Sequence, residues 1–149
     1  MTNEIDIVDP REWVRRNPGM FFRGARPDGL QLATWVLADV IETGGGGCRL
    51  ERTAGWWLLG SDVDWLLSPG LAVRELFTRV VAEPKRGTHS MRAEILLEVF
   101  CADVFTKSQS TEELVKGVSP ELDLLERIFA DQWTQRLVAF RLGADLKVP

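Results

Sequence analysis

The sequence predicts an α+β fold, because segments with helical periodicity alternate with segments whose apolar and polar residues alternate as in strands. A chain of 149 residues is expected to form a single domain, spanning 1–149, with a short N-terminal arm at 1–8. At this length about two-thirds of the unfolded surface can be buried, so the core needs neither disulfides nor a metal.

The first half of the chain is predicted to contain two helices and a hairpin. Asp9 can cap a short helix whose first residue is Pro10. Apolar residues cover most of a helix surface over 30–42, which predicts a buried helix. The glycines at 44–47 end it. The elements expected here are a helix from residue 10, an extended segment over 20–22, the helix over 30–42, and strands over 48–53 and 56–59 joined by Ala54-Gly55.

The second half is predicted to contain two helices and three strands. Residues 83–90 are polar and basic and are expected to form a loop. Residues 121–130 fit two interpretations, because Ser119-Pro120 is typical of a helix start while the leucines that follow also alternate as in a strand. The other expected elements are helices over 71–82 and 91–103 and strands over 104–107, 113–118 and 137–142.

Composition narrows the classes of function. A formal net charge of −4 disfavours direct nucleic-acid binding, which needs a clustered positive face. Two cysteines far apart, Cys48 and Cys101, fit a reducing cytoplasm in which both act as small hydrophobes. One histidine and no CxxC pattern predict no metal site, and from the sequence we expect neither a signal peptide nor a membrane span. We therefore expect a cytoplasmic domain without membrane contact. Its compositional oddity is six tryptophans with no tyrosine.

Four segments then occur in a specific order. Residues 14–21 read VRRNPGMF and are similar to VRKRPGMYIG, while residues 28–31 read DGLQ and are similar to DGxGLHH. These are motifs of the ATP-binding domain of gyrase B and topoisomerase IV, in the GHKL superfamily. Residues 93–104 resemble the helix after that family's GGLHGVG box, and residues 136–140 its GTxVxF strand. The resemblance implies a Bergerat fold: a two-layer sandwich with helices on one face of a mixed, mostly antiparallel sheet.

Residues that the resemblance places at the catalytic positions are apolar. Hydrolysis needs a carboxylate to activate water and an oxygen ligand for Mg²⁺, which the family supplies within an ExxDN pattern. Here the base position holds Val36 and the Mg²⁺ position holds Val40, while Asp39 keeps the intervening aspartate. We therefore expect no catalytic residues and no metal ligands, and Asp39 is interpreted mainly as a hydrogen-bonded core aspartate.

The nucleotide-binding boxes are altered as well. Where the family has DDGxG, this chain has Asp62 and Asp64 without the glycines, and where it has GGLHGVG, one glycine and His89 remain. The threonine of the GTxVxF strand falls on Arg136. The resemblance thus implies a vestigial cofactor pocket, whose candidate residues are Asp39, Asp62, Asp64 and His89.

Two functions are compatible with these losses. The first is a catalytically inactive pseudo-ATPase that needs no cofactor and serves as a scaffold for a protein partner or a second copy. The alternative is a divergent domain that still binds ATP with Mg²⁺ and hydrolyses it weakly or not at all. There Asp62 or Asp64 would hold the base, and Lys85, Arg86 and Arg92 the phosphates. A serine kinase of the same superfamily ranks behind both.

The tryptophans extend this hypothesis. Trp35 is expected in the core beside the altered pocket. Trp56 and Trp57 are adjacent on a predicted strand and must point to opposite faces. Either helices cover both faces, or one of Trp56, Trp57 and Trp65 marks an interaction surface.

Overall fold

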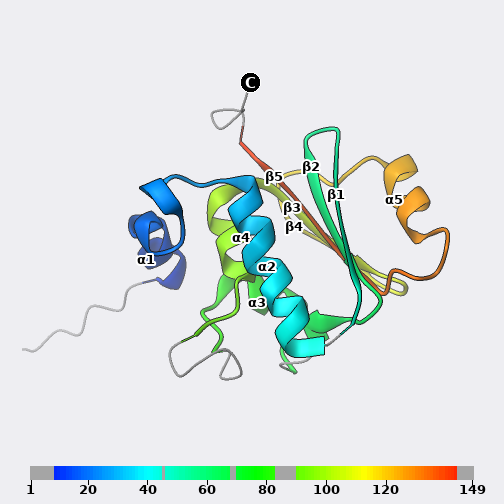
Figure 1. The fold of residues 1–149 in the computed structure, drawn as a ribbon, viewed down its shortest axis with the longest axis horizontal. Helices are drawn as coiled ribbons and strands as arrows, with labels where there is room; N and C mark the ends of the chain where they lie inside the picture. Colours follow the sequence, from blue (N-terminus) through cyan, green and yellow to red (C-terminus); the bar gives the residue numbers. More distant parts are fainter. Residues whose placement is uncertain (1–8, 45, 68–69, 83–89, 144–149) are drawn as a thin grey trace, which may run out of the picture.

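The computed structural model describes residues 9–44, 46–67, 70–82 and 90–143, and in it helices flank a five-stranded sheet (Figure 1). Along the chain the elements are α1 (Pro10–Arg16), α2 (Gly29–Gly44), β1 (Cys48–Thr53), β2 (Trp56–Ser61), α3 (Val73–Thr78), α4 (Glu94–Phe100), β3 (Cys101–Ser108), β4 (Glu112–Lys116), α5 (Leu122–Phe129) and β5 (Arg136–Leu142). Short 3-10 turns lie at Pro18–Met20, Arg23–Ala25 and Trp65–Leu67. The predicted α+β class is confirmed.

The sheet has the strand order β1-β2-β5-β3-β4, and each of these neighbouring pairs is antiparallel. The expectation of a mixed sheet is therefore wrong. The last strand in sequence, β5, lies at the centre, where Val138 faces Leu59 of β2 on one side and Thr106 of β3 on the other. This placement buries β5, which explains its nearly continuous apolar sequence.

Helices cover both faces of the sheet, so the expectation of helices on one face is also wrong. One core lies between the sheet and helices α2, α3 and α4. A smaller core on the opposite face joins Trp56 and Leu58 of β2 to Leu125 of α5, and Figure 1 shows α5 on the far side of the sheet from α2. Trp57 packs against the larger core and is half-buried. Coverage of both faces thus accounts for the adjacent Trp56 and Trp57.

Local sequence explains most element ends. The Asp9 carboxylate accepts a hydrogen bond from the Arg11 N–H at 2.9 Å and caps α1. Asp28 does the same for α2, accepting from the Gln31 N–H at 3.0 Å. In the hairpin, Ala54 and Gly55 have φ of 53° and 82°, the left-handed conformation that a two-residue turn requires.

Three boundaries differ from the sequence prediction. The helix expected over 91–103 ends at Phe100, and β3 starts at Cys101 without a connecting loop. The helix expected over 71–82 covers only Val73–Thr78, and the segment expected to be extended over 20–22 begins on the last residue of the 3-10 turn Pro18–Met20. Apolar runs such as 95–105 satisfy both periodicities, so burial rather than pattern decides where helix gives way to strand.

The two remaining predictions about local structure have clear outcomes. Residues 122–129 form the helix α5, which resolves the two interpretations of this segment. Cys101 is buried, and burial raises the pKa of its thiol above the ordinary value. Both cysteines are free; Cys48 is exposed on β1, so of the two only Cys101 lies in the core as a small hydrophobic residue. The expected N-terminal arm, 1–8, lies outside the described residues.

We predict that Gly29→Ala destabilises the protein by about 1–3 kcal/mol. A Cβ at Gly29 would lie 2.3 Å from Nε1 and 2.6 Å from Cε2 of Trp57, so the indole or the start of α2 must move. Urea unfolding followed by tryptophan fluorescence measures the loss. Gly19→Ala is the matched control, because its Cβ would meet Ala25 at an ordinary 3.7 Å. Equal stability of the two variants would contradict the prediction.

Candidate functional site

The residues at the expected catalytic positions lie inside the protein. Val36 and Val40 of α2 are fully buried in the larger core. Valine side chains offer neither a base nor a metal ligand, and here they pack among other buried apolar side chains. The part of α2 that faces the nucleotide in the resembled family is therefore packed against the protein's own core.

Asp39 is fully buried and is engaged by the segment that leads into α4. Its Oδ2 accepts a hydrogen bond from the Ala93 N–H at 2.7 Å and lies 3.4 Å from Nε of Arg92. The interpretation of Asp39 as a hydrogen-bonded core residue is thus confirmed. Because the start of α4 depends on this carboxylate, Asp39 joins α2 to α4 across 54 residues of sequence.

Arg92 and Glu94 complete a buried charged cluster with Asp39. The Arg92 guanidinium donates to the carboxylate of Glu94 and, at 3.3 Å, to the main-chain oxygen of Trp65. All three charged side chains are essentially inaccessible to solvent. Burial raises the pKa of Glu94 well above its ordinary value, the nearby Asp39 carboxylate raises it further, and Arg92 opposes both effects.

The raised pKa of Glu94 predicts a pH-dependent stability. When the pKa of a carboxyl group is higher in the folded than in the unfolded state, the folded protein loses stability as pH rises from the unfolded pKa toward the folded one. For a glutamate this loss begins at about pH 4.3. Glu94→Gln mimics the protonated form and does not share this loss. The free energy of unfolding of the variant minus that of the wild type should therefore increase as pH rises from about 4.5 to about 8. Urea titrations of both proteins across this range measure the difference. A difference that is constant or favours the wild type at higher pH would contradict it.

Asp62 and Asp64, the candidates for holding an adenine base, have different partners within the chain. The Asp62 carboxylate accepts a hydrogen bond from the Gly47 N–H at 2.8 Å and braces the end of the hairpin. Asp64 forms a two-point ion pair with Arg136, in which Nε and Nη2 each lie 2.9 Å from a carboxylate oxygen. The buried Arg136 also donates to Oγ1 of Thr106 at 3.1 Å.

Sequence reasoning missed these ion-pair partners. The sequence places Arg136 only at the position of a family threonine and Arg92 only among possible phosphate contacts, whereas Arg92 pairs with the buried Asp39 and Arg136 with the partly buried Asp64. The signal in the sequence is that each arginine stands just before an apolar segment, Arg92 before α4 and Arg136 at the start of β5. His89, Lys85 and Arg86 lie outside the described residues. Within the described ranges, no group of three or more histidine, cysteine or acidic side chains is arranged to hold a metal, and no helix is long and apolar enough to cross a membrane.

A separate apolar pocket lies beside α1. Its volume is about 230 Å³, and its walls include Trp13, Phe21, Trp35 and Met91. Phe21 makes edge-to-face contacts with both indoles, at centroid distances of 6.3 Å. The Nε1 of Trp35 donates a hydrogen bond to the Phe21 carbonyl at 2.9 Å. Trp35 is expected from the sequence in the core, and its side chain is partly buried at the edge of the core.

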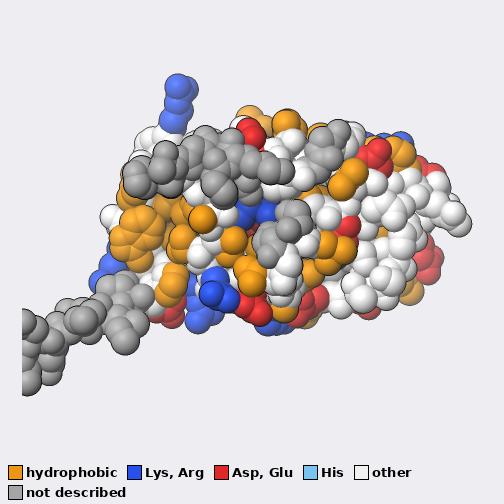
Figure 2. All heavy atoms as spheres, turned by 90° about the horizontal axis from the view of Figure 1, so that it is seen from below, with side chains coloured by type: hydrophobic (Ala, Val, Ile, Leu, Met, Phe, Trp, Pro, Cys, Tyr) orange, Lys and Arg blue, Asp and Glu red, His pale blue; other side chains and the backbone are white. Residues whose placement is uncertain are grey.

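This pocket opens onto an apolar surface. Trp13 is 39% exposed and Met20 is 61% exposed. Figure 2 shows hydrophobic side chains gathered at the end of the molecule where α1 lies. Exposed aromatic and methionine side chains at a pocket rim are common at protein–protein contacts.

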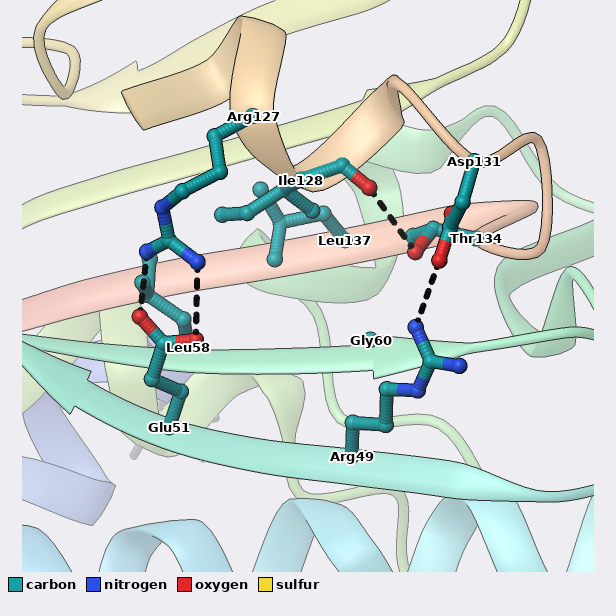
Figure 3. A pocket seen from close by; sticks show the side chains of 9 residues that line it. All are labelled: Arg49, Glu51, Leu58, Gly60, Arg127, Ile128, Asp131, Thr134 and Leu137. Atoms are coloured by element: carbon teal, nitrogen blue, oxygen red, sulfur yellow. Dashed lines mark hydrogen bonds and ion pairs between the residues drawn. The ribbon is translucent and has the colours of Figure 1, made fainter. Parts of the chain in front are cut away.

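A second, polar cleft lies beneath α5 (Figure 3). Its floor contains Leu58, and two ion pairs close its ends: Arg127 of α5 reaches Glu51 of β1, and Arg49 of β1 reaches Asp131 at 2.9 Å. These charges are already paired within the chain, on either side of a cleft of about 180 Å³ between α5 and the sheet.

Comparison with protein-family models, with curated proteins and with solved structures gives no match for this chain.

Proposed function

We propose that this chain is a catalytically inactive relative of the gyrase B-type GHKL ATPases that acts as a protein-binding scaffold. The observation that carries the proposal is the burial of three residues of α2, Val36, Asp39 and Val40. Val36 and Val40 are fully buried, and the intervening Asp39 carboxylate is committed to Ala93 and Arg92. A site for hydrolysis would need a water-accessible carboxylate and an oxygen ligand for Mg²⁺ at this place.

The binding role is supported by the surface beside α1. The motif that carries the family resemblance, residues 14–21, contributes Met20 and Phe21 to the apolar pocket. Trp13 and Met20 keep much of their surface exposed beside this pocket, and contiguous exposed apolar patches are typical of protein-binding sites. The proposed partner is a protein that inserts an apolar side chain into this pocket.

A phosphate-release assay with ATP and Mg²⁺ tests the catalytic half of the proposal. The wild type is expected to release phosphate at the rate of the buffer. Turnover that depends on Mg²⁺ and disappears in Asp39→Asn would overturn the proposal in favour of the divergent ATPase.

Affinity capture from the source cells tests the binding half. Trp13→Ser and Met20→Ser should each lose a partner that the wild type retains. Leu122→Ser is the matched control, because Leu122 is also exposed but lies on α5, away from the pocket. Capture that is equal for all four proteins would rule out this surface.

A further inference from the structure

The outer strand β1 has an open edge. It pairs with β2 on one side, and among the described residues no hydrogen bond reaches its other side. Cys48, Arg49, Leu50 and Arg52 are all exposed. An uncovered strand edge presents unpaired N–H and C=O groups that can pair with another strand.

The other edge strand, β4, is partly covered by a side chain of α3. At β4, the Arg74 guanidinium of α3 donates to the Leu114 carbonyl at 2.8 Å and is held there by Glu113 at 2.9 Å. A side chain from a neighbouring helix thus occupies part of the outer edge of β4. β1 is therefore the edge available for pairing.

The hairpin register shows which backbone groups of β1 point outward. The two-residue turn makes Thr53↔Trp56 a hydrogen-bonded pair, and such pairs recur at every second residue. The Asp62 N–H bonds the Gly47 carbonyl, as this alternation requires. The N–H and C=O groups of Arg49, Glu51 and Thr53 thus face β2, whereas those of Cys48, Leu50 and Arg52 face outward.

We propose that two copies of this chain pair through β1 about a two-fold axis at Leu50, joining their sheets into one. Residues whose backbone groups point outward must then face one another, which allows an axis at Leu50, Arg49 or Glu51 near the middle of the strand. An axis at Arg49 sets two arginines directly opposite, and an axis at Glu51 sets two glutamates opposite. Like charges in such positions are destabilising.

The axis at Leu50 gives complementary contacts instead. Arg49 of each copy then faces Glu51 of the other, in non-hydrogen-bonded pairs where side chains come closest. On the other face of the sheet the two Leu50 side chains, each 44% exposed, meet across the axis. The hydrogen-bonded pairs are Leu50 with itself and Cys48 with Arg52, so the three outward-facing residues are all satisfied.

The partners of Arg49 and Glu51 within each chain extend this arrangement. Asp131 holds Arg49 and Arg127 holds Glu51, as Figure 3 shows. In the dimer the order across the interface becomes Asp131, Arg49, Glu51 and Arg127, with alternating sign throughout. Charges held in position beforehand lose less side-chain entropy when the second copy binds. This inference does not depend on the proposed function.

Sedimentation velocity from about 1 μM to about 1 mM protein tests the dimer, because a single strand pairing buries little surface and is weak. The wild type should shift from monomer to dimer over this range. Arg49→Glu and Glu51→Arg should each weaken the homodimer about tenfold or more, since two attractive pairs become repulsive. Mixing the two variants should restore the wild-type affinity, because each copy then offers charges opposite to those of its partner.

Two further variants keep the test decisive. Leu50→Pro removes an outward N–H that β2 does not use, so the monomer should fold and the dimer should be lost. Glu112→Arg makes the same charge change on the edge strand β4 and should leave the dimer unchanged. A wild type that stays monomeric throughout, or a dimer that survives Leu50→Pro or is not rescued by mixing, would overturn the proposal.

Discussion

Replacing Arg92 by methionine should lower the free energy of unfolding by about 3–5 kcal/mol at neutral pH. Arg92 is buried between the carboxylates of Asp39 and Glu94, so its removal leaves acidic groups in the core without their counter-ion. Methionine is similar in length to the aliphatic stem of arginine, so the packing of that stem is largely kept while the charge is removed. Urea unfolding at pH 7 measures the effect.

Arg79→Met is the matched control for this prediction. Arg79 also pairs with a carboxylate, that of Glu75 at 2.6 Å, but both side chains are well exposed on the surface. Exposed ion pairs contribute about 0–1 kcal/mol. Similar losses in the two variants would show that the buried cluster has no special role in stability.

Introducing a carboxyl group in Val36→Glu should destabilise the protein by about 3–5 kcal/mol at pH 7 without creating ATPase activity. Val36 is fully buried, and a carboxylate there would be desolvated in the core that also holds Asp39 and Glu94. Burial raises the pKa of such a group, so the loss should shrink as pH falls toward about 4, where it is protonated in both states.

Two controls separate charge from size and from helix propensity. Val36→Gln has the same shape without the charge, so its difference from Val36→Glu should disappear at low pH. Ile41→Glu places the same residue on an exposed position of α2 and should change stability by less than about 0.5 kcal/mol. If Val36→Glu is as stable as Ile41→Glu at pH 7, the region around α2 is open to water and the account of a closed site is wrong.

Much of the fold follows from local sequence. Capping at Asp9, the apolar surface over 30–42 and the Ala54-Gly55 turn each predict an element that the structure contains. These signals are local, so no knowledge of the rest of the chain is needed. The class of fold follows from them, because helices and hairpins in this order must pack in layers.

Other features could not be predicted because they depend on distant residues. The segment 122–129 suits either a helix or a strand, and it becomes α5 because Leu125 is buried on the second face of the sheet. Central placement of β5 and coverage of that second face are likewise products of tertiary packing. A sequence pattern shows that a segment is half-buried, but not which partner buries it.

The candidate site illustrates the same limit for polar residues. The sequence identified Asp39 and Asp64 as carboxylates of interest, but not that Arg92 and Arg136 would pair with them. Arg92 and Asp39 are 53 positions apart in the sequence, and Arg136 and Asp64 are 72 apart. A local sequence pattern therefore cannot predict either pair. The sequence thus shows that Val36 and Val40 carry no catalytic group, and the packing shows that both are buried in the core.

Isothermal titration of the wild type with ATP and Mg²⁺ tests the central claim most directly. If Val36, Val40 and the Asp39–Arg92 contact fill the place of a nucleotide site beside α2, the titration should show no saturable heat of binding. ATP should then also leave the thermal unfolding temperature unchanged. A true ligand at one hundred times its Kd would stabilise by about 2.7 kcal/mol. Saturable binding that is lost in Asp62→Asn would contradict the account and establish a nucleotide-binding domain.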